Sequence, residues 1–147
     1  MATAPAPAPP AIRMARTYPA SRERVFRAWT DPQAVARWLA PGDEFTTTVH
    51  ELDPRVGGRY RIEMRTGTDS YVVAGSYREI RPPEKLVFTW RWEFEPESAE
   101  SLVTVALFDR GGETELVLTH ERLPNQESRD KHEHGWGGCL DRLARAV

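Results

Sequence analysis

Residues 86–94 read Leu-Val-Phe-Thr-Trp-Arg-Trp-Glu-Phe, and this stretch decides the fold class. Large apolar side chains occupy every second position and alternate with smaller or charged ones. Because successive side chains of a strand point to opposite faces, the alternation predicts a β-strand with one strongly apolar face. The aromatic residues of that face are Phe88, Trp90, Trp92 and Phe94. Each ring buries about 150–250 Å², which is more than a solid core of this size needs.

Outward from this stretch, strand and turn signals recur in both directions along the chain. Further strands are predicted over residues 12–18, 45–52, 59–65, 70–80, 103–107 and 114–120. The pairs Gly57-Gly58, Pro82-Pro83 and Gly111-Gly112 lie between strands and predict tight turns, so neighbouring strands should run antiparallel. Gly75, inside one strand, indicates a bulge or a close backbone approach.

Helical signals flank these strands on both sides. Ser21 and the pair Asp31-Pro32 each predict the start of a short helix directly after the first strand. After Pro124 the apolar period changes from two to about 3.6, which predicts a long C-terminal helix. We therefore predict an α+β fold in which a curved antiparallel sheet of about six to seven strands wraps around that helix.

The composition is typical of one globular domain with almost no net charge. The chain has 147 residues, of which 39% are hydrophobic and 29% charged, and its net charge is −2. This balance provides no field that would attract nucleic acid. No stretch approaches the ~18 apolar residues needed to cross a bilayer. We expect neither a nucleic-acid partner nor membrane insertion.

The N-terminus and the cysteine count bear on domain limits and location. Residues 2–10 contain only Ala, Thr and Pro, which predicts a disordered Ala/Pro-rich arm over residues 1–11 and a single domain over residues 12–147. The start lacks the basic and apolar regions of a signal peptide. The single cysteine, Cys139, excludes an intramolecular disulfide. We expect a cytoplasmic protein, either a monomer or a homodimer.

Several motifs, in order along residues 12–146, resemble the helix-grip (START-like, SRPBCC) superfamily. The matching segments include Ser21-Arg-Glu-Arg-Val-Phe-Arg-Ala-Trp-Thr-Asp-Pro32, Val56-Gly-Gly-Arg-Tyr60, residues 75–90, residues 114–120 and His134-Gly-Trp136. The branch they resemble is the one named after the activator of heat-shock-protein-90 ATPase homologue. The resemblance implies a hydrophobic cavity between the sheet and the C-terminal helix. Members of the superfamily bind lipids, polyketides or hormones, and some are cyclases or aromatases.

Twelve residues are candidates for lining such a cavity. They are Trp38, Tyr60, Met64, Tyr71, Tyr77, Phe88, Trp90, Trp92, Leu116, Leu118, His120 and Trp136. A ligand pocket needs apolar walls with a few polar groups, which His120, the tyrosine phenols and the indole N–H groups would supply. The alternative interpretation of the same residues is a fully packed core.

Chemistry beyond binding depends on the histidines. Strand parity points His120 inward, where it is a hydrogen-bonded structural residue, a polar ligand anchor or a general base. His132 and His134 lie about 200° apart on the predicted helix and cannot clamp one ion from it. Because no spacing brings three or four metal ligands together, we expect no metal and no other cofactor.

Three functions remain open from the sequence. The first is binding of a small hydrophobic ligand, aromatic, polyketide-like or lipid-like, as in the sequestering resistance proteins of related fold in enediyne-producing bacteria. The second is a cofactor-independent cyclase or dehydratase on the same scaffold, with His120 and a tyrosine as its acid/base pair. The third, implied by the name of the resembled family, is a partner of an Hsp90-type chaperone ATPase. We favour binding over catalysis because the sequence contains no nucleophile motif.

Overall fold

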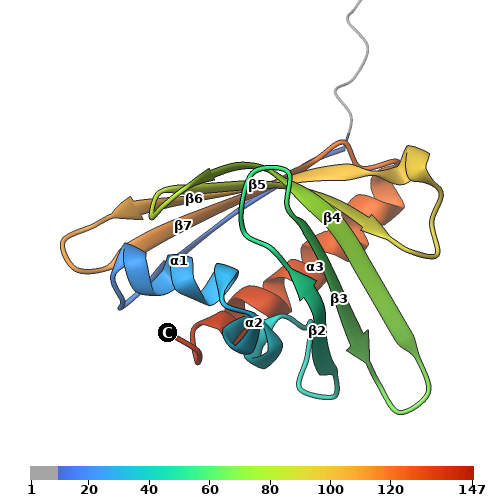
Figure 1. Cartoon of the computed structure of the whole chain (residues 1–147), viewed down its shortest axis with the longest axis horizontal. Coiled ribbons are helices and arrows are strands. Elements are labelled where there is room, and N and C mark those ends of the chain that lie inside the picture. Colours follow the sequence, from blue (N-terminus) through green and yellow to red (C-terminus); the bar gives the residue numbers. More distant parts are fainter. Residues whose placement is uncertain (1–9) are drawn as a thin grey trace, which may run out of the picture.

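A computed structural model describes residues 10–147, which contain seven strands and three α-helices (Figure 1). The strands are β1 (Ile12–Tyr18), β2 (Thr46–Leu52), β3 (Arg59–Arg65), β4 (Ser70–Arg81), β5 (Lys85–Trp92), β6 (Ser101–Asp109) and β7 (Thr114–Glu121). The helices are α1 (Arg22–Thr30), α2 (Pro32–Trp38) and α3 (Gln126–Leu143), with a short 3-10 helix at Glu97–Ala99. The strands form one antiparallel sheet in the order β1-β7-β6-β5-β4-β3-β2. The predicted α+β helix-grip fold is confirmed.

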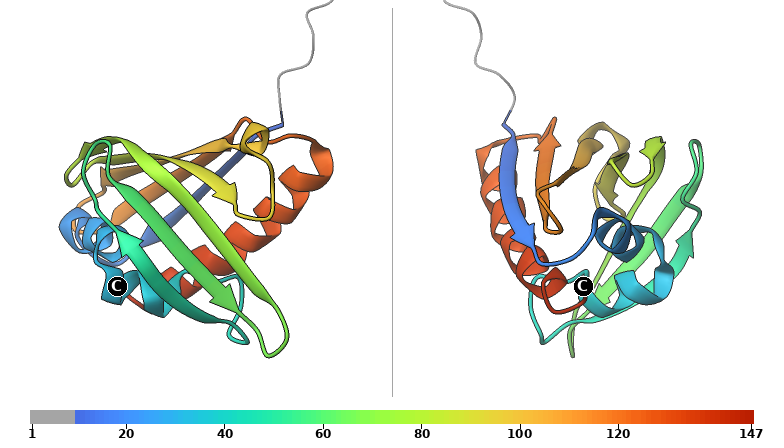
Figure 2. Two further views of the ribbon diagram at one scale, coloured as in Figure 1. Left: turned by 45° about the vertical axis from the view of Figure 1, so that its right-hand side comes forward. Right: turned by 90° about the vertical axis from the view of Figure 1, so that its left-hand side faces the viewer.

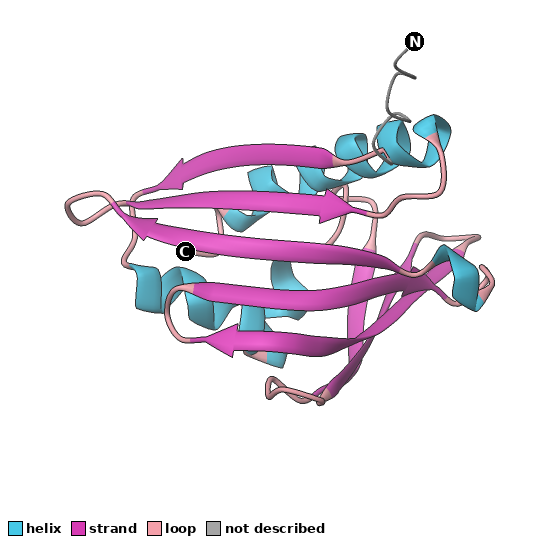
Figure 3. Cartoon of the chain, turned by 90° about the horizontal axis from the view of Figure 1, so that it is seen from above, coloured by secondary structure: helices cyan, strands magenta, loops and turns pink. Residues whose placement is uncertain are grey.

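All three α-helices lie on the concave side of the sheet (Figures 1 and 3). The first two begin at the predicted caps: Ser21 accepts a hydrogen bond from the backbone N–H of Arg24, and Asp31 from that of Gln33. These side chains satisfy backbone donors that have no partner inside the helix. The sequence signals for both helix starts are therefore confirmed.

Close backbone packing between β4 and β5 helps to curve the sheet. A Cβ atom on Gly75 would lie 2.0 Å from the carbonyl oxygen of Thr89, so only glycine fits there. The pairing of the two strands shifts register between Tyr77 and Glu79, and such bulges bend a sheet. The prediction of a close approach at Gly75 is confirmed, and Figure 2 shows the resulting curve around α3.

The second half of α3 anchors the helix to the rest of the fold. Leu140 and Leu143 are completely buried, and Tyr18 of β1 donates a hydrogen bond to the Leu140 carbonyl at 2.8 Å. Gly138 allows the helix to approach Pro41 so closely that a Cβ atom would lie 2.0 Å from the Pro41 carbonyl oxygen. This end of α3 is thus tightly packed.

Two predictions from the sequence need comment. The alternation was expected to run through Phe94, but β5 ends at Trp92 and Phe94 is 71% exposed. The chain turns there because the Glu95 N–H bonds back to the Trp92 carbonyl and Pro96 follows directly. The predicted arm lies almost wholly outside the described residues and stays a prediction. Within residues 10–147 no helix is long and apolar enough to cross a bilayer.

Candidate ligand-binding site

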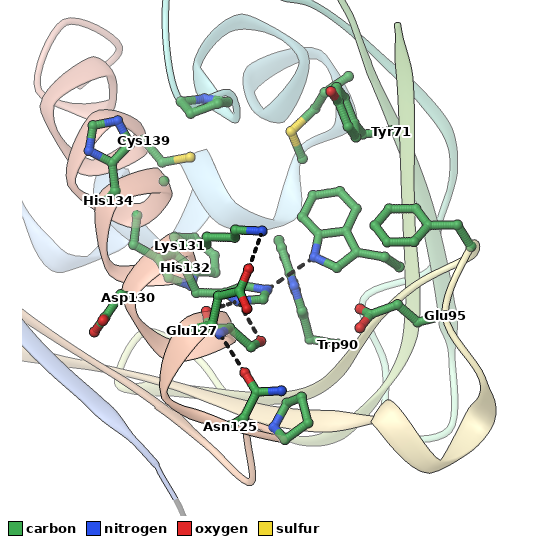
Figure 4. A pocket seen from close by; sticks show the side chains of 18 of the residues that line it. Tyr71, Trp90, Glu95, Asn125, Glu127, Asp130, Lys131, His132, His134 and Cys139 are labelled. Atoms are coloured by element: carbon green, nitrogen blue, oxygen red, sulfur yellow. Dashed lines mark hydrogen bonds and ion pairs between the residues drawn. The ribbon is translucent and has the colours of Figure 1, made fainter.

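A cavity of about 810 Å³ lies between the concave face of the sheet and the first half of α3 (Figure 4). We call it the outer cavity. Its sheet side and adjoining loops contribute Pro41, Phe45, Met64, Tyr71, Trp90, Trp92, Phe94, Glu95 and Pro124. Its helix side contributes Asn125, Glu127, Ser128, Asp130, Lys131, His132, His134, Gly135, Trp136 and Cys139. Its walls come from segments far apart in the sequence.

Aromatic rings form the apolar part of the outer cavity. The β5 alternation places Trp90 and Trp92 on the concave face, with ring centroids 5.5 Å apart. Trp136 of α3 faces Trp90 at 5.0 Å, and Phe94 stacks on Trp92 at 6.2 Å. Rings at these separations and tilts pack favourably with one another. Indole rings from both β5 and α3 thus line the cavity.

The mouth of the outer cavity is polar. Asn125 caps α3 by accepting a hydrogen bond from the Ser128 N–H at 2.8 Å. Glu127, in the first turn of the helix, forms an exposed ion pair with Lys131 one turn later, at 3.1 Å. Such exposed pairs contribute little to stability. The site therefore combines an apolar interior with a charged, hydrated rim.

His132 holds Trp92 in the wall. Its Nδ1–H donates to the Ser128 carbonyl at 2.7 Å, so its Nε2 is free to accept from the Trp92 indole N–H at 3.0 Å. Only the neutral imidazole can make both bonds, because the charged form has no acceptor. Burial lowers the pKa of His132 and favours this neutral form.

His120 holds Trp136 in a second, deeper network. The Trp136 indole N–H donates to His120 Nδ1 at 3.0 Å. The Ser101 hydroxyl donates to the Trp90 carbonyl at 3.0 Å and therefore accepts from His120 Nε2–H at 2.7 Å. Burial, with a smaller contribution from His132, lowers the pKa of His120 to about 3. Both ring nitrogens are thus engaged in a neutral, completely buried side chain.

Comparison of the sequence with known protein families identifies the family of this chain. The sequence model of the family described as "Activator of Hsp90 ATPase homolog 1-like protein" matches residues 19–147. The chain belongs to this family. The resemblance noted from the motifs is confirmed, and its position along the chain agrees with the fold.

Comparison with individual proteins shows how far the likeness extends. A crystal structure of a Chromobacterium violaceum protein is 32% identical, with a TM-score of 0.86 over 94% of this chain and 96% of that one. The AHSA1 protein from Silicibacter pomeroyi is 27% identical, with a TM-score of 0.80 over 92% of this chain and 95% of that one. The human activator of 90 kDa heat shock protein ATPase homolog 1 is 26% identical over 85% of this chain. This chain spans only 33% of the length of that relative.

The structure distributes the twelve predicted site residues of this family member among three places. Met64, Tyr71, Trp90, Trp92 and Trp136 line the outer cavity. Tyr60, Tyr77 and Phe88, again with Trp90 and Trp136, line a smaller inner cavity of about 30 Å³. Trp38, Leu116, Leu118 and His120 line neither cavity and are all buried. The prediction that these residues bind ligand stays a prediction.

The polar half of the outer cavity was not predicted from the sequence. The residues of α3 that form it include Ser128, Lys131 and His132. Of these three, the sequence drew attention only to His132, as a possible metal ligand. One signal was available, because Ser128, His132 and Trp136 follow one another at intervals of four and so share a helix face. Among residues 10–147 no three His, Cys, Asp or Glu side chains are placed to hold a metal ion.

Proposed function

We propose that this protein binds a small aromatic or otherwise apolar molecule in the outer cavity. The observation that carries the proposal is the cavity itself, about 810 Å³ with Trp90, Trp92 and Trp136 in its walls. Sites for small ligands have volumes of about 300–1,000 Å³, apolar walls and a few polar groups. Two of these indoles are fixed by hydrogen bonds to histidines, so the walls are preformed. A preformed site loses less entropy on binding.

Binding without catalysis is favoured by the state of His120. A general base must reach the proton that it removes, whereas His120 is completely buried and does not line the outer cavity. Its two nitrogens are already engaged. A cyclase or dehydratase mechanism based on this histidine would first have to dismantle the network that holds Trp136.

The test fills the outer cavity from Gly135 of α3. A Cβ atom at Gly135 would meet nothing within 4 Å, and the residue lies one turn from Lys131 and Cys139, which also line the cavity. Gly135→Phe should therefore occupy ligand space without disturbing the core. We expect it to abolish binding of the neutral probe N-phenyl-1-naphthylamine, followed by probe fluorescence.

The matched control is Gly137→Phe on the same helix. Gly137 does not line the outer cavity, and its Cβ would make only an ordinary contact, 3.8 Å from Met14. This variant should bind the probe as the parent does. Far-ultraviolet circular dichroism and thermal melting establish that each variant is folded. Undiminished probe binding by folded Gly135→Phe would overturn the proposal.

A partnership with an Hsp90-type ATPase is the second candidate, and the printed name of the human relative is what favours it. Such a partner would act through its surface. Stimulation of a purified Hsp90-type ATPase should then be equal for the parent and Gly135→Phe. We further propose that the protein is bacterial and cytoplasmic. We propose that it has one START-like domain at residues 12–147 and is a monomer or a homodimer.

A further inference from the structure

The five tryptophans of the chain divide into two groups by hydrogen bonding. Three indole N–H groups donate: Trp38 to the Ala28 carbonyl at 2.7 Å, Trp92 to His132 and Trp136 to His120, both at 3.0 Å. Within residues 10–147, the indole N–H groups of Trp29 and Trp90 are buried and have no partner. Because a buried unpaired donor is unfavourable, each such group needs an explanation.

Both unpaired indoles line the inner cavity. Its volume of about 30 Å³ exceeds the ~10–15 Å³ that one oxygen-sized group requires. The remaining lining is apolar or aromatic, and among the described residues its only hydroxyls belong to Tyr60, which donates to the Thr89 carbonyl, and to Tyr77. The inner cavity is therefore lined by the two residues whose indole donors lack a partner, and it has space for one acceptor atom.

We propose that the inner cavity is a subsite for a carbonyl oxygen of the ligand, which accepts hydrogen bonds from Trp29 and Trp90. This inference rests on ligand binding in the outer cavity. A ketone or quinone oxygen has two lone pairs and brings no hydrogen, so it matches two donors. A hydroxyl would bring a hydrogen that also needs an acceptor. A carboxylate would bring a charge into a site without a positive partner.

Trp90 connects the subsite with the outer cavity. Trp90 and Trp136 line both cavities, so these two rings form the wall that the cavities share. Trp136 is tethered to His120, whereas the Trp90 indole has no hydrogen bond to break when it turns. A planar ligand in the outer cavity can therefore displace the Trp90 ring and place its carbonyl between the two donors.

The experiment compares 9-fluorenone with fluorene, two planar tricyclic molecules that differ by the carbonyl oxygen. Each competes with N-phenyl-1-naphthylamine for the parent protein and for Trp29→Phe and Trp90→Phe. The parent should bind fluorenone about tenfold more tightly than fluorene. Each variant keeps an aromatic ring but removes one donor, so this ratio should fall toward one. Trp38→Phe, whose indole lines neither cavity, should preserve the ratio.

An infrared measurement provides a signature that loss of packing would not produce. The carbonyl stretch of fluorenone should move to lower frequency on binding to the parent and return toward its value in apolar solvent in both variants. Equal affinities of the two compounds for the parent, as a site filled by water alone would give, would overturn the subsite and leave the proposed function standing. Failure of both compounds to bind would overturn both proposals.

Discussion

Acid should destabilise this protein through His120, and the size of the effect follows from its burial. The folded protein lowers the pKa of His120 from 6.5 to about 3 because the charged ring would lose its hydration. Below pH 6.5 the unfolded chain binds a proton at this position and the folded chain does not. The contribution of the neutral His120 to the unfolding free energy is therefore fully present above pH 6.5 and is lost progressively as pH falls toward 3. Between about pH 7.5 and pH 4.5 the loss amounts to about 3 kcal/mol.

The assay is urea unfolding across this pH range for the parent and His120→Gln. A glutamine amide retains an acceptor and a donor but does not titrate. The variant will be less stable at every pH, but its loss of unfolding free energy on acidification should be about 3 kcal/mol smaller than that of the parent. His134→Gln, which removes an exposed imidazole, should follow the parent. Parallel pH profiles of parent and His120→Gln would refute the buried neutral histidine.

Three further predictions test local features. Asp31→Ala removes the cap of α2 and should lower the unfolding free energy by about 1 kcal/mol in urea, and an unchanged midpoint would contradict the cap. Gly138→Ala should lower the melting temperature through its clash with a backbone carbonyl, whereas Gly135→Ala should raise it, and equal values would contradict the helix packing. Burial raises the pKa of Cys139 to about 12, so a disulfide reagent should label it only after unfolding, and rapid labelling of native protein would contradict this.

Local patterns sufficed to predict most of the fold. The helix caps at Ser21 and Asp31 and the alternation along β5 depend on residues within a few positions of one another, and the structure confirms them. The limit of this reasoning is visible at Phe94. The alternation of apolar and charged residues continues in the sequence after Trp92, but a turn followed by Pro96 ends the strand. Alternation alone does not state where a strand stops.

The candidate site was less accessible to sequence reasoning because burial does not distinguish a cavity wall from a packed core. Leu116 and Leu118 alternate as regularly as Trp90, but β7 places them outside both cavities. The partners of His120 are equally hidden from pattern reasoning. Ser101 and Trp136 lie 19 and 16 residues away, on different elements, and no periodicity links them.

Neutral histidines explain how a cavity of this size persists between the sheet and α3. Aromatic walls without polar tethers would tend to close on one another, since each would gain buried apolar surface. His132 fixes Trp92 and His120 fixes Trp136, so collapse of either ring would break a buried hydrogen bond. Trp90 stands between these two fixed rings without such a bond. The cavity thus has a rigid frame and one adjustable wall, and the adjustable wall is where a ligand carbonyl would find its donor.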